Sequence, residues 1–200
     1  MDFVMGKEQE VARQLFRDFA EKEVKPLAQE VDEEERFPAE TVAKMQKFGF
    51  MGIPFPKDMG GQGCDSLTYA ICVEELSRVC ATTGVIVSAH TSLGCDPIKK
   101  FGTPEQIKKY LVPMAQGKLL GAFGLTEPNA GTDASGQQTK AVLEGDHYVL
   151  TGRKIFITTG GKADIYIIFA MTDQPKGVTG ISAIIVEKDF PGRPNGKKEL

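Results

Sequence analysis

The sequence predicts an α+β protein, with an all-α helical domain over residues 1–119 followed by an antiparallel β-barrel or β-sandwich domain over residues 120–200. Two observations predict this order. Apolar residues recur at helical spacing through the first region, whereas the second region contains short β-branched and aromatic runs separated by turn residues. The period changes near Leu119 and Leu120 without a flexible linker. We therefore expect two domains, each of one structural class.

Composition and charge exclude several kinds of protein. A chain of 200 residues can bury roughly 70% of its unfolded surface, so it does not need disulfides for stability. Its net charge of −3 gives no electrostatic basis for binding nucleic acid or an anionic membrane. No apolar run reaches the roughly 20 residues of a membrane-spanning helix. The N-terminus does not resemble a signal peptide, and we expect a cytoplasmic protein or a mature organellar form.

The cysteines and histidines do not suggest a metal site. No Cys-x-x-Cys pair occurs, and the two histidines are far from metal-ligand spacing. We expect reduced and mostly buried thiols at Cys64, Cys72, Cys80 and Cys95.

The helical region begins with an amphipathic segment whose apolar positions form two adjacent rows, Val11, Leu15 and Phe19 beside Ala12, Phe16 and Ala20. Pro26 is expected to bend or end this helix. Further helices are predicted at about 38–47, 67–79 and 84–101. Thr103-Pro104-Glu105-Gln106 has the pattern of a capping box with proline at the first helical position, and predicts the start of another helix.

The second region contains five apolar runs, which we interpret as strands. Glycine-containing turns separate them, a spacing that favours antiparallel hairpins. The runs are at Val142, 148–150, 155–157, 165–169 and 181–186.

The segment Gly124 to Gly136 is the most informative stretch of the chain. It combines three glycines and a proline with several short hydroxyl and carboxyl side chains. Such a loop can present backbone N–H groups and small donors to a phosphate or a flat ring. The same composition is also common in ordinary surface connections, and the segment matches neither the P-loop nor the dinucleotide-binding glycine pattern.

The second unusual segment is Lys154 to Gly161. On a strand, Phe156 and Thr158 would share one face, so that the ring could stack on a planar heterocycle while the hydroxyl bonds to it. The alternative is a core phenylalanine beside a turn threonine.

Taken together, the two segments resemble the acyl-CoA dehydrogenase family. The resemblance is carried by Gly-Leu-Thr-Glu-Pro-x-x-Gly-Thr-Asp-x-x-Gly at 124–136 and Lys-x-Phe-Ile-Thr-x-Gly-Gly at 154–161. It extends over nearly the whole chain, from Asp2-Phe3 through the glycine-rich stretch at 54–63 to Ala163-Asp164. The version of the loop in this chain is most similar to the bacterial short-chain, butyryl-CoA branch.

The resemblance implies an FAD site and assigns residues to it. Phe123, Leu125 and Thr126 would line the isoalloxazine, and Gly131 and Thr132 would approach the pyrophosphate. Phe156 would stack on the flavin, Thr158 would bond near N5, and Ile157 between them is included in the cofactor contact. Thr132 would also touch the acyl-CoA, and the acyl pocket would be floored by Ile86, Ala89 and His90. His90 has an alternative reading as a core or interface histidine.

The resemblance also implies the reaction: α,β-dehydrogenation of a short-chain acyl-CoA to the trans-2-enoyl-CoA, with electrons passed to an electron-transfer flavoprotein. Members of the family are homotetramers with a C-terminal helical bundle that carries the glutamate base. This bundle has no counterpart among these 200 residues, so we expect the base beyond Leu200 and an inactive chain when it is alone. Glu127 is expected to be structural.

Two alternatives remain open at this stage. The chain could be a non-catalytic FAD- or CoA-binding module, or it could share the fold with acyl-CoA oxidases and related flavin monooxygenases.

Overall fold

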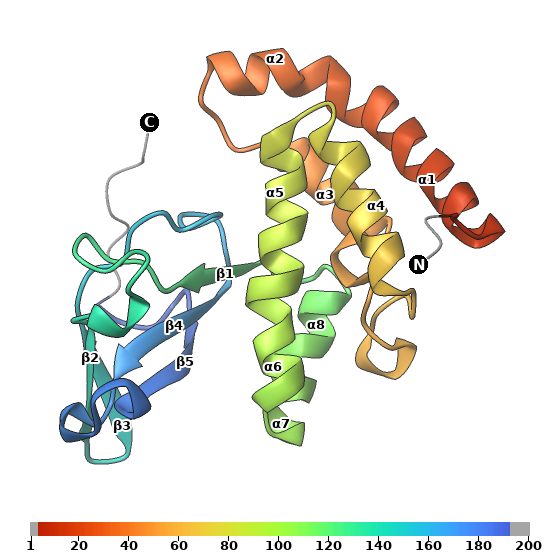
Figure 1. Cartoon of the computed structure of the whole chain (residues 1–200). Helices are drawn as coiled ribbons and strands as arrows, with labels where there is room; N and C mark the ends of the chain where they lie inside the picture. Colours follow the sequence, from red (N-terminus) through yellow and green to blue (C-terminus); the bar gives the residue numbers. More distant parts are fainter. Residues whose placement is uncertain (1–3, 193–200) are drawn as a thin grey trace. The chain divides into compact units, whose positions relative to one another are not determined.

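The structure, a computed structural model, describes residues 4–192. Residue contacts group them into a helical unit that ends at Leu120 and a sheet unit that begins at Gly121 (Figure 1). The Asp2-Phe3 motif and the predicted end of the second domain at Leu200 lie outside the described residues. The predicted fold class, a helical region followed by a sheet region, is confirmed.

The helical unit contains three long helices that are each interrupted by a π-helical turn. The first consists of α1 (Lys7–Phe19), a π turn (Ala20–Val24) and α2 (Lys25–Glu33). The second consists of α5 (Ala81–Ala89), a π turn (His90–Cys95) and α6 (Asp96–Phe101). The third consists of α7 (Pro104–Gln106), a π turn (Ile107–Leu111) and α8 (Val112–Ala115).

Each π turn ends two residues before a proline: Pro26, Pro97 or Pro113. A proline inside a helix lacks an N–H donor, and its ring collides with the carbonyl four residues earlier. The wider π turn contains that carbonyl in all three cases and accommodates the ring. The first helix therefore does not end at Pro26 but continues to Glu33.

Two single helices complete the helical unit: α3 (Ala39–Lys47) and α4 (Ser66–Ser77). The side chain of Asp65 caps α4 by accepting a hydrogen bond from Thr68 N at 2.7 Å, and the predicted capping box at Thr103 is present. Short 3₁₀ turns occupy Phe50–Gly52 and Lys57–Met59.

The core of the helical unit is built where α1 packs against α4 and α4 against α5. Phe50 meets the rings of Phe16 and Phe19 at centroid distances of 5.2 and 4.7 Å. Only part of the predicted apolar face of the first helix is buried, because Val11 and Leu15 are more than half exposed. Of the four free thiols, Cys72 and Cys95 are buried and Cys64 is exposed.

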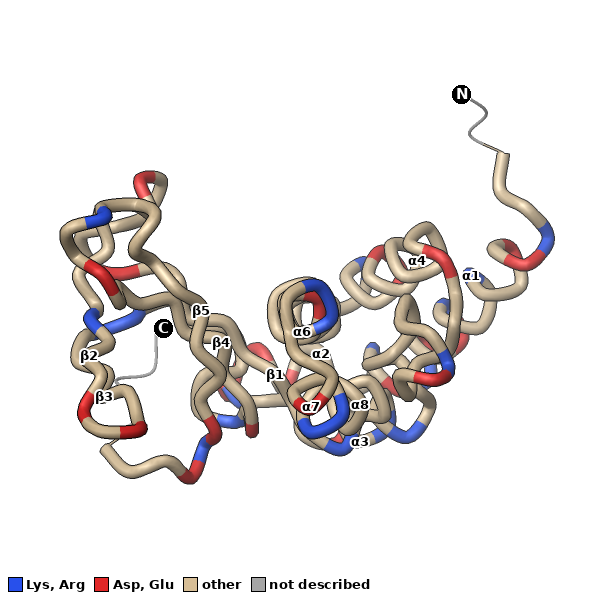
Figure 2. The backbone as a smooth tube through the Cα atoms, turned by 90° about the horizontal axis from the view of Figure 1, so that it is seen from below, with Lys and Arg blue, Asp and Glu red and all other residues tan. Residues whose placement is uncertain are grey.

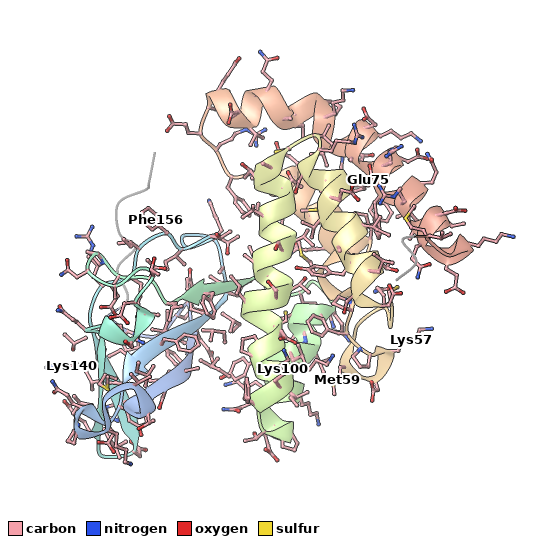
Figure 3. All side chains as sticks on the ribbon, in the orientation of Figure 1. Lys57, Met59, Glu75, Lys100, Lys140 and Phe156 are labelled. Atoms are coloured by element: carbon pink, nitrogen blue, oxygen red, sulfur yellow. The ribbon has the colours of Figure 1, made fainter. Side chains whose placement is uncertain are left out.

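A buried carboxylate joins α1 to α4. Glu75 on α4 is 1% exposed and accepts hydrogen bonds from Arg13 at 3.1 Å, from Arg17 at 2.9 and 3.0 Å, and from Arg78 at 3.3 Å (Figure 3). Hydrogen bonds from Arg17 hold the pKa of Glu75 below its ordinary value of 4.5, although burial opposes this shift. The carboxylate is fully occupied in holding the two helices together.

Replacing this carboxylate should destabilise the helical unit. Glu75→Gln keeps the shape but removes the charge that the arginines surround, and we expect a loss of about 2–3 kcal/mol in the free energy of unfolding. The neighbouring Glu74→Gln is the matched control and should cost less than about 1 kcal/mol, because its side chain is 60% exposed. Urea unfolding followed by circular dichroism measures both; equal losses would contradict the assignment.

The stability difference between the wild type and Glu75→Gln should also depend on pH. Because the folded-state pKa of Glu75 is lowered, its contribution to stability is present above its ordinary value of 4.5 and is lost as the pH falls below that value. The difference in unfolding free energy between the wild type and Glu75→Gln should therefore shrink between about pH 5 and pH 3. A difference that stays constant over this range would show that the charge is not responsible.

The sheet unit is a five-stranded mixed sheet around one central strand, β4 (Ile165–Met171). β5 (Ile181–Glu187) is antiparallel to β4 along one edge. On the other edge β1 (Gly121–Gly124) is parallel to β4, with Gly124 opposite Ile168, and β2 (Lys140–Glu144) follows with Lys140 opposite Met171. β3 (His147–Thr151) is antiparallel to β2. A 3₁₀ segment, Gln174–Gly180, connects β4 to β5.

The sheet differs from the predicted topology in two respects. The hairpin pairs β2–β3 and β4–β5 are antiparallel as expected, but β1 and β2 both run parallel to β4. The predicted strand at 155–157 is absent: residues 152–157 form no ladder, and Phe156 adopts a φ of +55°, which breaks the extended backbone. The alternating pattern alone does not reveal a residue that leaves the β region.

Candidate functional site

The candidate site is built on the loop between β1 and β2, residues 125–139 (the donor loop). It leaves the sheet opposite Ile168 and returns opposite Met171, so its two ends are only about 10 Å apart along β4. Met171 N donates to Thr139 O at 2.8 Å and fixes the return. A loop of this length with adjacent ends is compact and is held on one edge of a rigid strand.

The donor loop is folded by its own hydrogen bonds. Glu127 and Ala130 exchange backbone hydrogen bonds of 3.0 and 3.1 Å around the turn at Pro128 and Asn129. Further along, Asp133 Oδ1 accepts from Ser135 N at 3.1 Å and caps the short 3₁₀ turn Ala134–Gly136. The loop therefore has a definite shape before any ligand is considered.

Glu127 is the buried anchor of the donor loop. It is 5% exposed, and its carboxylate accepts from Gln138 N at 2.6 Å, from Thr139 N at 2.9 Å and from Lys154 Nζ at 2.7 Å. Burial by itself raises the pKa of Glu127, but these donors outweigh it and lower the pKa to about 2. Such a carboxylate is ionised and occupied, so it is not available as a general base. This geometry agrees with the structural role expected for it.

The second part of the site is the segment that follows β3, residues 152–163 (the Phe156 segment). Phe156 is 69% exposed and Thr159 has a φ of +63° (Figure 3). Left-handed backbone costs a residue with a side chain about 1–2 kcal/mol. Thr159 Oγ1 donates to Gly121 O at 3.0 Å, and Tyr166 OH donates to Gly160 O, so the strained turn is held from two sides. Strain of this kind, with an aromatic ring held in solvent, is typical of a binding site.

The two parts lie against each other. Ile155 N donates to Thr126 O at 2.9 Å, and Lys154 Nζ donates to Leu125 O at 2.9 Å. The structure thus brings Thr126 next to the segment that carries Phe156 and Thr158. Phe156 and Thr158 do not share the face of a strand, because the strand predicted at 155–157 is absent.

Three of the predicted hydroxyl groups are uncommitted. Among the described residues, the side chains of Thr126, Thr132 and Thr158 have no hydrogen-bond partner. Ser135 and Thr159 differ, since Ser135 donates to Asp133 and Thr159 donates to Gly121 O. The buried hydroxyl of Thr139, at the end of the donor loop, also has no partner. Thr126 and Thr158 are partly buried, which makes hydration of their hydroxyls less complete. These donors are available to a ligand.

Two glycines have no explanation within the fold. A methyl group placed on Gly131 or Gly161 would meet nothing within 4 Å, and neither residue has a φ in the left-handed region. Gly145 and Gly177 are equally open, but their positive φ explains them. Both unexplained glycines lie in the two parts of the site, where a missing side chain lets a ligand approach the backbone.

The remaining predicted cofactor residues serve the sheet as well. The ring of Phe123 packs at a centroid distance of 5.2 Å from that of Phe169, and Leu125 is partly buried. Ile157 packs against the cluster of Ala122 and Tyr166, so its side chain supports the fold. A cofactor contact by these three residues remains a prediction.

The predicted acyl-pocket residues are inside the helical unit. Ile86 is 2% exposed and belongs to its main core cluster, and Ala89 is 6% exposed. His90 is fully buried, with Nε2 at 3.2 Å from Met114 O and at 3.4 Å from Cys95 Sγ. Burial lowers the pKa of His90 to about 4. This geometry favours the alternative, a neutral core histidine, and weighs against a pocket floor made by Ile86 and His90.

Sequence reasoning missed the roles of Lys154 and Gln137. Lys154 is 8% exposed, and Gln137 Oε1 accepts its third hydrogen bond at 2.9 Å. Lys154 begins the motif Lys154 to Gly161, and a buried loop carboxylate at Glu127 requires a buried cation. The role of Lys154 could have been inferred from this need of Glu127 for a cationic partner.

The part of the chain that the structure describes contains no cluster of histidine, cysteine or acidic side chains that could hold a metal ion. Across those same residues, each helix is too short or too polar to cross a lipid bilayer. Lys, Arg, Asp and Glu are interspersed along both units (Figure 2).

The chain thus combines a helical unit, a mixed sheet unit, and a loop with uncommitted donors that packs against the segment of an exposed aromatic ring. The chain belongs to the acyl-CoA dehydrogenase family. Residues 6–118 match the N-terminal domain of acyl-CoA dehydrogenase, and residues 122–199 match its middle domain.

Relatives and solved structures agree with this assignment. The chain is 63% identical over 199 residues to the short-chain specific acyl-CoA dehydrogenase of Clostridium acetobutylicum, covering 100% of this chain and 52% of that protein. A chain from a structure of the electron-transferring flavoprotein of Acidaminococcus fermentans matches with a TM-score of 0.97 and 52% identity, over 100% of this chain and 53% of that one. Butyryl-CoA dehydrogenase of Megasphaera elsdenii matches with a TM-score of 0.91 and 47% identity, over 96% and 51%. The chain spans about half the length of these relatives.

The strain at Phe156 predicts an unusual order of stabilities. At the positive φ of residue 156, glycine is unstrained whereas alanine keeps the strain. Phe156→Gly should therefore be more stable than Phe156→Ala by about 1 kcal/mol. At an ordinary exposed position glycine is the less stable of the two. Thermal or urea unfolding of both variants measures this difference. An alanine variant at least as stable as the glycine variant would contradict the observed backbone.

Proposed function

We propose that this chain supplies the flavin- and pyrophosphate-binding part of an FAD site in an enzyme that dehydrogenates short-chain acyl-CoA. The single observation that carries the proposal is the set of uncommitted hydroxyls at Thr126 and Thr132 in the donor loop and at Thr158 in the segment of the exposed, strained Phe156. The proposal includes the domain division 1–119 and 120–200. It is supported by the family membership and by the names of the relatives described above.

The residues present fit FAD. Phe156 offers a ring face for stacking on the isoalloxazine, and the hydroxyls of Thr126 and Thr158 can donate to polar atoms of that ring. Around Gly131 the backbone is open, and the N–H groups of Gly131 and Thr132 have no partner among the described residues, so they can donate to a phosphate. When bound, FAD supplies the hydride acceptor, and donors near its ring tune its potential.

The chemistry also requires a base that these residues do not supply. Removing the α-proton of a thioester needs an available carboxylate and a polarised carbonyl. Glu127 is the carboxylate buried in the donor loop, and it is held by Lys154 and two backbone amides with a pKa of about 2. We propose that the base comes from outside these residues and that the chain by itself does not turn over.

Electron-transfer flavoprotein is the proposed electron acceptor, and a homotetramer is the proposed assembly. Support for the acceptor comes from the 52% identical chain solved in a structure of the electron-transferring flavoprotein of Acidaminococcus fermentans. Oxygen consumption with butyryl-CoA separates this proposal from an acyl-CoA oxidase or a flavin monooxygenase. Sedimentation of the whole protein tests the tetramer.

The cofactor part of the proposal is tested by removing one hydroxyl at a time. Thr126→Val and Thr158→Val should each weaken FAD binding about tenfold, the effect of losing one hydrogen bond, while the unfolding midpoint changes little because neither hydroxyl has a protein partner. Quenching of FAD fluorescence on titration measures the affinity. Thr151→Val is the matched control, since Thr151 is an exposed strand residue on β3. Unchanged affinity in both site variants would contradict the proposal.

The catalytic part of the proposal is tested by the visible absorbance of the bound flavin. The whole protein that contains this chain should be yellow and should bleach with butyryl-CoA, whereas the chain of 200 residues alone should not bleach at an enzymatic rate. Bleaching of the chain alone would show that it contains a base. A whole protein that is yellow and never bleaches would support a non-catalytic binding module instead.

A further inference from the structure

Lys154 occupies a central place between the two parts of the site. Its ammonium donates to Leu125 O at 2.9 Å, to Glu127 Oε1 at 2.7 Å and to Gln137 Oε1 at 2.9 Å. A lysine ammonium carries three N–H donors, so these acceptors use its full capacity. With only 8% of its side chain exposed, water cannot replace them readily. The ammonium therefore fixes the positions of its three acceptor oxygens relative to one another.

Those acceptors belong to both ends of the donor loop. Leu125 lies where the loop leaves β1, and Gln137 lies where it returns toward β2. Glu127 extends the connection, because it accepts from Gln138 N at 2.6 Å and Thr139 N at 2.9 Å. Lys154 thus joins the two ends of the donor loop.

The same lysine is part of the Phe156 segment. Its neighbour Ile155 donates to Thr126 O at 2.9 Å, so Thr126 is flanked by residues 125 and 127, which Lys154 holds, and is itself bound to residue 155. Phe156 follows at once. One buried ammonium and its acceptors therefore hold the backbone of Thr126 against Ile155, directly before Phe156, while Thr159 and Tyr166 hold the turn on the other side of Phe156.

Lysine is suited to this task in a way that arginine is not. The three acceptors come from a backbone carbonyl, a carboxylate and an amide that belong to different parts of the loop. A compact ammonium can serve three such directions, whereas a planar guanidinium presents its donors in one plane and needs more room.

We propose that Lys154, through Glu127 and the Leu125 carbonyl, is a positioning residue of the cofactor site: it fixes the donor loop against the Phe156 segment so that the Thr126 hydroxyl and the Phe156 ring are held ready for the flavin. This inference rests on the proposed function. Lys154 does not itself need to touch the cofactor.

The test separates positioning from stability by removing the charges singly and together in the whole flavoprotein. Lys154→Met leaves Glu127 buried and unpaired, so it should unfold more easily, and Lys154→Met combined with Glu127→Gln should recover much of the unfolding midpoint. FAD affinity should stay at least tenfold weaker in the double variant, and the visible circular dichroism of the flavin should differ from that of the wild type. Lys188→Met, which breaks the more exposed pair with Asp164, is the matched control and should change neither readout.

Recovery of both FAD affinity and the flavin spectrum in the double variant would overturn the inference and make the pair a stability element only. A second measurement does not depend on FAD. Amide hydrogen exchange in the cofactor-free chain should be at least tenfold faster across 125–139 in the double variant, with β4 and β5 unchanged. Unchanged exchange in the loop would overturn the inference, whereas failure of the wild type to bind FAD would overturn the proposed function alone.

Discussion

The buried ion pair between Glu127 and Lys154 is the constraint on which the candidate site depends. A charge placed in a protein interior must be paired and hydrogen-bonded, and here every donor of the ammonium and both oxygens of the carboxylate are used. The pair therefore has one geometry that satisfies all of its members. Because its members come from both ends of one loop and from the start of another segment, that geometry also determines where the site residues lie.

The sheet supplies the rigid frame for this pair. β4 is the central strand, and the adjacent ends of β1 and β2 on one of its edges set the base of the donor loop. A parallel β1 makes this possible, since the chain leaves the sheet at Gly124 and must travel through the loop before it returns at Lys140. The site is thus a loop on one edge of β4, whose ends are held together by the Glu127–Lys154 pair.

The fold class followed from the sequence because periodicity reports which face of an element is buried. The helical and strand segments were predicted for this reason, whereas the capping box at Thr103 and the hairpins were predicted from local capping and turn residues. Strand direction was not, because a β-rich pattern is the same for parallel and antiparallel pairs. The π turns before Pro26, Pro97 and Pro113 also escaped prediction, because the hydrophobic pattern does not distinguish an α-helix from the wider turn that accommodates a proline.

The site was predicted through motifs more than through geometry. The donor loop and Phe156 were identified, but the extended backbone assumed for Phe156 was wrong, because a positive φ at a bulky residue is imposed by anchors elsewhere, at Thr159 and Tyr166. No role for Lys154 was predicted from the sequence, because its burial depends on the carboxylate of Glu127, 27 residues earlier in the chain. For His90 the sequence left two interpretations open, a contact with the acyl chain and a core histidine. The structure buries the ring inside the helical unit, which favours the second interpretation, and the acyl contact stays an untested prediction.

The most direct test of this account is a crystal structure of the whole protein with FAD bound. We expect the isoalloxazine to contact the Phe156 ring, the hydroxyls of Thr126 and Thr158 to hydrogen-bond to the flavin, and the donor loop to keep the backbone and the Glu127–Lys154 pair described above. FAD bound away from these residues, or a loop that must refold and break the pair to admit it, would contradict the claim that the site is preformed.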